Sequence, residues 1–520
     1  MRFKPSEENL SEEQINTGLK NIVKDGLFAE AMATLTGGAF LVALALKLGA
    51  SNFQIGILAA LPTFSSIFQL LAIFVLNKYK NRRSISVYSS FFARLPLFLI
   101  SFLPFLFSPF ISLNIMIGLL FMHFMFGSIS GCSWNSWMKD LVPEEKLGSY
   151  FSGRSRLIQM LNVTLSLICA FSLDFVKGSY SQYEVPTYAL MFFLGGLSGL
   201  AGIFMIAKTP EPKMAPVRKN LFKLFHKPFQ NVNFRNLMVF NSFWAFAVNL
   251  ATPFFSVYLL KFLGLPLSYV VGFSILSQVT NILFIRIWGK YSDKYSNKTI
   301  LRICAPVYLM CFVAWTFTTM PGYHSLTIPL LTLIYVINGI TLAGINLALN
   351  NIGLKLAPKE GEAIVFLTAR SMMNALFAAI APIIGGYFAD FFSKRQLSWN
   401  LEWKSPEGKM VMRTLELQQW DFFFLFAFIL GLIALYRLSY VKEKGDVRRS
   451  VIMNEIFSEL SGQLKNNAAF NGFSSMINFP FAYFALLKRK RRIDRYRINK
   501  KKTEETWTLP MPSRRKAVGG

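Results

Sequence analysis

The stretch Asp293-Lys-Tyr-Ser-Asn-Lys-Thr299 lies in a short polar loop between two long apolar runs, and it repeats the earlier loop Asn77-Lys-Tyr-Lys-Asn-Arg-Arg83. Four of the seven positions are identical or exchange Arg for Lys. We call the shift that carries position 77 onto position 293 the repeat offset. At this offset Arg154 falls on Arg370, and Pro143 misses Pro358 by one position. Because two separate loops agree on one offset, the sequence indicates an internal duplication.

Apolar runs flank these loops along most of the chain. The 520 residues are 53% hydrophobic, include 53 Phe and are only 16% charged, whereas soluble domains are about 25% charged. Stretches of about 18 or more apolar residues are long enough to cross a bilayer as helices. We therefore predict an all-α integral membrane protein with twelve transmembrane helices, arranged as two pseudo-symmetric six-helix bundles.

The predicted spans fall into two sets of six. The first set covers residues 24–47, 54–76, 87–107, 112–136, 155–176 and 187–207, and the second covers 236–260, 267–288, 300–320, 327–352, 364–391 and 419–438. The sets define an N-terminal bundle over 1–207, a basic linker over 208–235, a C-terminal bundle over 236–440 and a basic tail over 441–520.

The distribution of Lys and Arg predicts the orientation. The loops after spans two, four, six, eight and ten are rich in these residues, and the opposite loops are poor in them, except for the long loop 393–418. Because cytoplasmic loops retain the excess of Lys and Arg, we expect both termini to lie in the cytoplasm. The protein is expected to be a multi-pass protein of the plasma membrane. The net charge of +28 does not indicate nucleic-acid binding, since 18 of the 55 Lys and Arg follow Val441 and most others lie in short loops.

The sequence predicts no cofactor, no metal site and no enzymatic activity. The four cysteines lie in apolar runs without C-x-x-C spacing, the three histidines are scattered, and neither H-E-x-x-H nor G-x-S-x-G occurs. Two alternatives stay open: a membrane-embedded transferase using Asp140, Glu144 and Glu145, and a solute sensor or scaffold that does not transport.

Several loops resemble those of the major facilitator superfamily. Residues 289–298, Gly-Lys-Tyr-Ser-Asp-Lys-Tyr-Ser-Asn-Lys, are similar to its G-x-x-x-D-[RK]-x-G-[RK] loop signature, and residues 137–154 resemble the loop between spans four and five of bacterial members. Three positions depart from the family pattern. Asn77 replaces the usual Asp, Asn297 replaces Gly, and His123 stands where many proton-coupled members have Arg.

The resemblance implies secondary active transport of a small organic solute by alternating access, in a cavity lined by spans one, four, seven and ten. Candidate cavity residues are the polar and Trp side chains of these spans, together with one arginine of span three: Glu30, Thr34, Arg94, His123, Ser133, Trp134, Asn241, Trp244, Asn249, Asn338, Asn346 and Asn350. This set of side chains favours a neutral or cationic solute. The protein is expected to act as a monomer within the lipid bilayer.

Glu30 and Arg94 are ionisable residues within predicted spans, where a charge costs at least about 2.5–3.5 kcal/mol. Glu30 is therefore a candidate for binding and releasing a coupling proton, and His123 is a second candidate. The alternatives are a fixed Glu30–Arg94 ion pair, or side chains that reach toward the membrane interface.

The family-like loops are candidates for gating. Asp293 is expected to accept hydrogen bonds from a neighbouring helix start and to pair with Lys294 or Lys298 in one conformation only. Asp140, Arg154 and Arg370 are the further gating candidates.

In the tail, residues 470–487 are apolar but contain Asn, Ser and Pro, and a basic cluster follows them. We expect this segment to lie on anionic lipid of the inner leaflet, with a soluble, disordered tail as the alternative.

Overall fold

The computed structural model describes residues 10–143, 146–213, 226–319, 325–358, 363–405, 408–418, 420–443 and 445. Residues up to 446 form one compact unit, and residues 447–520 belong to a second. Residues 214–225 of the predicted linker and nearly all of the tail, including the predicted lipid-facing segment 470–487, lie outside the described residues. The boundaries predicted for linker and tail stay predictions.

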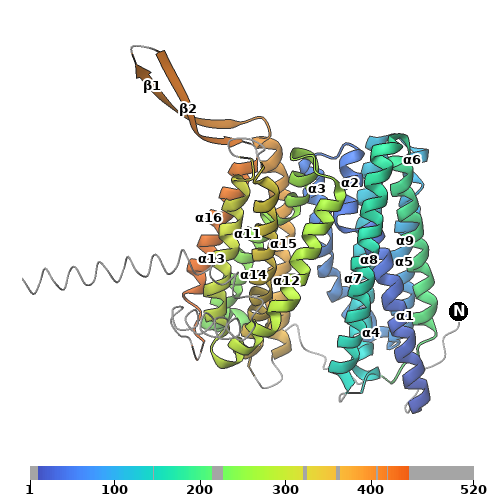
Figure 1. Ribbon diagram of the computed structural model, residues 1–520. Helices are drawn as coiled ribbons and strands as arrows, with labels where there is room; N and C mark the ends of the chain where they lie inside the picture. Colours follow the sequence, from blue (N-terminus) through green and yellow to red (C-terminus); the bar gives the residue numbers. More distant parts are fainter. Residues whose placement is uncertain are drawn as a thin grey trace, which may run out of the picture. The chain divides into compact units, whose positions relative to one another are not determined.

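Every predicted span of the N-terminal half lies on helix (Figure 1). The elements are α1 Glu12–Thr36, α2 Gly38–Lys47, α3 Asn52–Ser65, the 3-10 turn Ser66–Phe68, α4 Gln69–Tyr79, α5 Arg82–Ile100, α6 Leu103–Leu106, α7 Pro109–Leu141, α8 Leu147–Ser179, the 3-10 turn Ser181–Tyr183 and α9 Glu184–Ala207.

The C-terminal half repeats this helical order and adds a β-hairpin. Its elements are α10 Lys227–Gln230, α11 Val232–Val257, the π turn Tyr258–Phe262, α12 Leu267–Lys294, α13 Asn297–Thr316, α14 Thr327–Leu356, α15 Ala363–Phe392, β1 Gln396–Ser405, β2 Gly408–Gln418 and α16 Trp420–Leu438.

Eleven helical segments of the described chain are long and apolar enough to cross a membrane. The third predicted span is the one that falls short, because α5 carries Arg82, Arg83 and Arg94 within 19 residues. It nevertheless packs against α7 and α9 as a full member of the bundle. The helical membrane fold is thus confirmed, with α5 as the predicted span that is not apolar enough by itself.

The first predicted span is broken in the middle. Helix α1 ends at Thr36, Gly37 is extended, and Gly38 begins α2 with a φ of +55°. This left-handed conformation favours glycine, since a Cβ atom would strain it. The break turns the chain where it borders the central cavity described below.

Polar side chains cap the N-termini of the helices that follow the repeated loops. The Asn81 side chain accepts a hydrogen bond from the backbone N–H of Ser84 at the start of α5. Ser296 does the same for Thr299 at the start of α13. Each cap satisfies a backbone donor that has no partner within its helix, so the two copies of the repeat use one local device.

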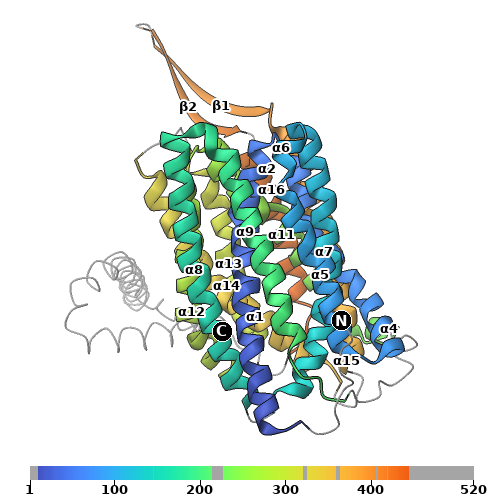
Figure 2. The same cartoon turned by 90° about the vertical axis from the view of Figure 1, so that its right-hand side faces the viewer.

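Within each half, the helices pack around apolar and small side chains. In the N-terminal half, α1 packs on α9, and α5 packs on both α7 and α9 (Figure 2). In the C-terminal half, α11 packs on α15 and α16, and α13 packs on α14 and α16 (Figure 1). Phe255 and Trp315 stack at 4.4 Å between ring centroids in the C-terminal core. Large apolar side chains such as Phe74 and Phe110 are about two-thirds exposed, as expected for helices whose solvent is lipid.

The loop 393–418 was predicted only as a long connection, and it forms an antiparallel β-hairpin. The two strands project beyond the helices in both views (Figures 1 and 2). We call this end of the bundle, where α3 and α12 begin and α15 ends, the hairpin end. The opposite end, where α9 ends and α5 and α13 begin, is the linker end.

Candidate functional site

A cavity of about 550 Å³ lies between the two halves. The break between α1 and α2 contributes Thr36 and Gly37, α7 contributes His123, and α11 contributes Pro253 and Ser256. Most of the remaining lining is Ala, Val, Leu, Ile and Phe. The central cavity therefore offers an apolar surface with few hydrogen-bonding groups, as small-molecule sites generally do.

A second, more polar pocket of about 300 Å³ lies within the N-terminal half. Its lining includes Asp25 of α1, Arg94 of α5, His123 and Trp134 of α7, and Arg154 of α8. His123 borders both this polar pocket and the central cavity. The two spaces therefore meet at one side chain.

The predicted alternative of a Glu30–Arg94 ion pair is wrong, because Arg94 pairs with Asp25. The Arg94 Nη2 to Asp25 Oδ1 distance is 3.0 Å, and the two side chains are 9% and 6% exposed. Arg94 Nη1 also donates to the carbonyl of Gly199 at 2.7 Å. A Cβ atom at Gly202 would lie 2.7 Å from Arg94 Nη1 and 2.8 Å from Asp25 Oδ1, so α9 needs glycine there to admit the pair.

Glu30 lies on a different face of α1. It follows Asp25 by five positions, which is about 140° around a helix. Its Oε1 accepts a hydrogen bond of 2.8 Å from Asn162 of α8, and the same amide donates to Thr34 at 3.1 Å. Glu30 and Thr34 thus meet at one amide of α8, and neither lines the central cavity or the polar pocket.

The ring of His123 is oriented by one hydrogen bond. Its Nδ1 lies 2.7 Å from the carbonyl oxygen of Ala93. Since a carbonyl only accepts, Nδ1 carries the hydrogen, and Nε2 is the nitrogen that is left for a ligand or a proton. This nitrogen belongs to the residue shared by the two spaces.

The other predicted cavity residues do not form one site. Ser133 donates to the carbonyl of Arg82 at 2.9 Å near the linker end, and Trp244 packs on Phe240 and Tyr308. Of the predicted asparagines, Asn241 and Asn338 are buried with side-chain oxygens that find no partner in the described structure, Asn249 donates to the carbonyl of Ala245, and Asn346 and Asn350 are exposed on α14.

Two carboxylates join the halves at the hairpin end, and sequence reasoning missed both. Asp390 of α15 accepts hydrogen bonds from the backbone N–H groups of Asn52 (3.2 Å) and Phe53 (2.9 Å), at the start of α3. Asp174 of α8 accepts from Leu267 and Ser268, both at 2.8 Å, at the start of α12. We call these contacts the hairpin-end caps.

The hairpin-end caps follow the internal repeat. Asp390 corresponds to Asp174 at the repeat offset already found in the loops, and Leu267 falls one position short of exact correspondence with Asn52. Each half therefore supplies one carboxylate and receives one. This shared offset was the signal from which sequence reasoning could have found them.

Close backbone packing accompanies one of the caps. A Cβ atom at Gly56 of α3 would lie 2.2 Å from the carbonyl oxygen of Pro382, and one at Gly386 of α15 would lie 2.4 Å from that of Asn52. No side chain fits at such distances, so α3 and α15 meet backbone to backbone. The halves are therefore closed against each other at the hairpin end.

The family model of the Major Facilitator Superfamily matches residues 26–369, more than half of the chain. The chain belongs to the Major Facilitator Superfamily. Among solved structures, the nucleoside transporter NupG is similar, with 13% identity, a TM-score of 0.58, and coverage of 83% of this chain and 100% of that one. The inward-open xylose transporter XylE from E. coli has 13% identity, a TM-score of 0.57, and coverage of 84% and 98%.

A bacterial homologue of the iron transporter ferroportin, in an inward-facing state, has 14% identity and a TM-score of 0.56, with coverage of 84% of this chain and 100% of its own. Identities this low show the fold alone. No curated protein sequence matches the chain significantly. The fold of this major facilitator protein, with its apolar helices, supports membrane transport and a multi-pass membrane location.

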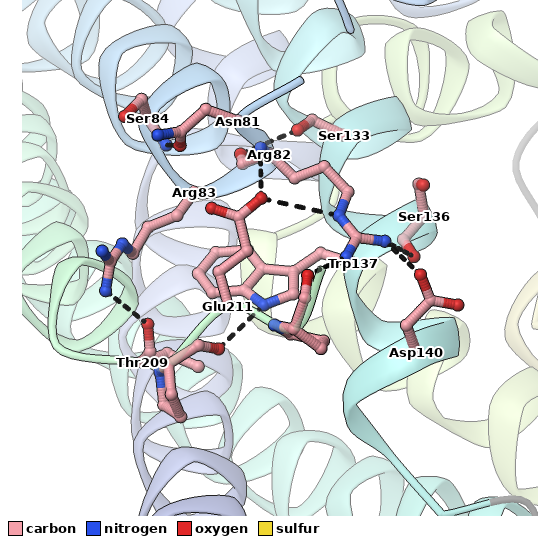
Figure 3. Close-up of polar contacts among 12 residues, drawn as sticks. Asn81, Arg82, Arg83, Ser84, Ser133, Ser136, Trp137, Asp140, Thr209 and Glu211 are labelled. Atoms are coloured by element: carbon pink, nitrogen blue, oxygen red, sulfur yellow. Dashed lines mark hydrogen bonds and ion pairs between the residues drawn. The ribbon is translucent and has the colours of Figure 1, made fainter. Parts of the chain in front are cut away.

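The linker end of this major facilitator protein holds a buried polar network around Arg82, the first residue of α5 (Figure 3). Its Nη1 contacts Asp140 and the carbonyl of Ser136, and its Nη2 donates to the carbonyl of Pro212 at 2.6 Å. The Arg82 backbone N–H donates to Glu211 Oε1 at 2.6 Å, and the Glu211 side chain is 1% exposed. The network ties the end of α7 and the segment after α9 to the start of α5.

The second half of this major facilitator protein repeats the cap without the arginine. Glu443, after α16, accepts from the backbone N–H groups of Asn297 (3.2 Å) and Lys298 (2.8 Å) at the start of α13. Lys298 Nζ donates to the carbonyls of Val441 (2.6 Å) and Ser439 (3.3 Å). In this structure, then, the lysine is bound within its own half and not to Asp293.

The remaining gating candidates are dispersed. The Asp293 side chain is exposed and forms no hydrogen bond or ion pair in the described structure, and Lys294 lies 5.3 Å from the ring centroid of Tyr295. Arg370 donates to the carbonyl of Leu349 at 2.6 Å. A role in gating for these residues stays a prediction.

Proposed function

We propose that this protein carries a small organic solute across the membrane by alternating access, and that the hairpin-end caps hold the pathway closed on the outer side. The observation that carries the proposal is a reciprocal pair of contacts: Asp174 caps a helix of the C-terminal half, and Asp390 caps a helix of the N-terminal half. Because Lys and Arg are concentrated in the linker-end loops, that end is assigned to the cytoplasm. The described conformation is then one that is closed outside.

The chemistry of the caps suits a contact that forms and breaks. Each carboxylate accepts two backbone hydrogen bonds at a helix N-terminus, where the helix dipole favours negative charge. A hydrogen bond to a charged group contributes about 1.5–3 kcal/mol. When the halves separate outside, water can solvate both the carboxylate and the exposed N–H groups. The caps therefore bias the closed state without locking it.

Transport itself is tested by counterflow in proteoliposomes. A solute that stabilises the purified protein is loaded unlabelled inside the vesicles, and its labelled form is added outside. We expect transient accumulation of label above equilibrium. A solute that binds without counterflow indicates a non-transporting sensor, and recovery of a chemically altered solute indicates a transferase.

Loss of both caps is expected to open the outer side. In Asp174→Asn/Asp390→Asn, each side chain keeps its size but loses its charge, so the helix starts of α3 and α12 are held less strongly. Spin labels at Tyr180 and Tyr269, exposed side chains at the hairpin end of the two halves, report the change. We expect the inter-label distance distribution to gain a longer component.

Glu184→Gln is the matched control for this measurement. Glu184 is also a carboxylate of the hairpin end, but it binds Lys47 of its own half at 2.6 Å. Its replacement should leave the inter-half distances unchanged. An unchanged distribution in the double variant, or an equal shift in Glu184→Gln, would contradict the role of the caps.

Proton coupling through Glu30 stays a prediction. The supporting observation is that Glu30 is half-buried in a predicted span and bound by a neutral amide, Asn162, with no cation to fix its charge in the described structure. The pairing of Asp25 with Arg94 adds a second carboxylate that a transport cycle could protonate.

A further inference from the structure

Arg154 has a charge that no carboxylate of the described structure neutralises by direct contact. Its Nε lies 3.5 Å from the carbonyl oxygen of Ile22, its guanidinium lies 5.2 Å from the ring centroid of Trp134, and it sits directly over Gly26. Its terminal nitrogens form no hydrogen bond with the part of the chain that is described. They belong to a side chain that lines the polar pocket.

The balance of charge in the polar pocket is positive by one unit. Its ionisable lining consists of Asp25, Arg94, His123 and Arg154. Asp25 and Arg94 compensate each other in the ion pair, and His123 is counted as neutral, a state that its single Nδ1 hydrogen bond allows. Since a half-buried cation gains most from a partner of opposite charge, the pocket favours a ligand with a single negative charge.

The second copy of the repeat lacks most of these charges. At the repeat offset, Asn241 corresponds to Asp25, and Met310 corresponds to Arg94. Only Arg154 has a charged equivalent, Arg370, and that arginine donates through Nη1 to the carbonyl of Leu349 at 2.6 Å. One half thus folds without the charged pocket, and its arginine is satisfied by its own backbone.

The neighbouring surfaces define the rest of the ligand. Trp134 forms one wall beside Arg154, and His123 marks the junction with the mostly apolar central cavity. A ligand spanning the junction would place its anionic group at Arg154 and its body toward the apolar wall. Asp25 would repel a second negative charge, which disfavours dianions such as phosphate monoesters.

We propose that the polar pocket is the head-group site for small organic monoanions of the carboxylate class, with Arg154 as the cation that binds the carboxylate. This inference rests on the proposed transport function and names its substrate class. It replaces the expectation of a neutral or cationic solute, which was based on residues that the structure does not bring together.

The test uses the full-length protein in detergent and matched pairs of probes: benzoate and benzamide, phenylacetate and phenylacetamide, hexanoate and hexanamide. Thermal unfolding is measured at constant ionic strength with each probe at millimolar concentration. We expect at least one carboxylate to raise the unfolding temperature while its amide does not. Arg154→Gln should weaken binding of that carboxylate about 10- to 100-fold, and Arg154→Lys should weaken it less. The control Arg156→Gln, at an exposed arginine of the same helix outside the pocket lining, should not weaken it.

Three results would overturn the assignment: stabilisation by amides equal to that by carboxylates, no stabilisation by any carboxylate, or carboxylate binding that Arg154→Gln leaves unchanged. Failure of the transport proposal has a different signature. Carboxylate binding that depends on Arg154, without counterflow, would keep this site and reject transport. Counterflow of a neutral solute that is indifferent to Arg154→Gln would keep transport and reject the site.

Discussion

Replacement of Asp25 by asparagine is expected to lower the free energy of unfolding by about 3–5 kcal/mol, the cost of removing one partner from a buried ion pair. Asparagine keeps the size of the side chain but removes the charge that compensates Arg94, whose side chain is 9% exposed. Arg154 lines the same pocket, so the variant leaves two cations and no acid there. Unfolding is followed in detergent with a thiol-reactive dye, because three of the four cysteines are buried.

Two controls separate the ion pair from a general effect of losing an acid on α1. Asp25→Asn/Arg94→Gln should recover much of the loss, since it removes the uncompensated charge. Glu30→Gln should cost less, because Glu30 is half-buried and bound by a neutral amide. An Asp25→Asn variant that unfolds at the wild-type temperature would show that solvent, rather than Asp25, compensates Arg94.

The helices could be predicted from the sequence because crossing a bilayer is a local property of about 20 residues. Prediction of helix boundaries from hydrophobicity failed where the local sequence is less apolar or where the backbone breaks. Helix α5 starts at Arg82, ahead of the span predicted from position 87, because its arginines are satisfied by partners from α9, the following segment and α7. The break at Gly37 was missed since its signal, a positive φ at Gly38, concerns the backbone alone.

The candidate site was harder to predict because its contacts join residues that are distant in sequence. Asp25 was not among the predicted residues, and its partner Arg94 lies in another helix. The hairpin-end caps likewise join the two halves of the chain. His123 and Trp134 were predicted and do line the polar pocket, because a polar or aromatic residue on an apolar helix is visible locally. Only the internal repeat carries long-range information in a single sequence.

Glu211 is expected to be the second residue whose neutralisation strongly destabilises the protein. Glu211→Gln removes the carboxylate that accepts from the backbone N–H of Arg82 and lies 3.6 Å from its Nε, and the Arg82 side chain is fully buried. Asp140 still contacts Arg82, although its own side chain is 36% exposed. The loss of unfolding free energy should therefore lie near the lower end of about 3–5 kcal/mol, measured by the same thermal assay.

Glu443→Gln provides the matched comparison, because Glu443 caps α13 as Glu211 caps α5 but has no buried arginine beside it in the described structure. Its ion pair with Lys355, at 4.0 Å, involves a lysine that is 47% exposed and contributes little, so its replacement should cost mainly the weakened cap, about 0.5–2 kcal/mol. The difference between the two variants is then the contribution of the Arg82–Glu211 pair, and the cycle with Arg82→Gln measures it directly. Equal losses in the two variants, with no coupling in the cycle, would mean that Asp140 and the carbonyls alone compensate Arg82. In that case Glu211 would act as a helix cap and would not hold the ends of α5, α7 and α9 together.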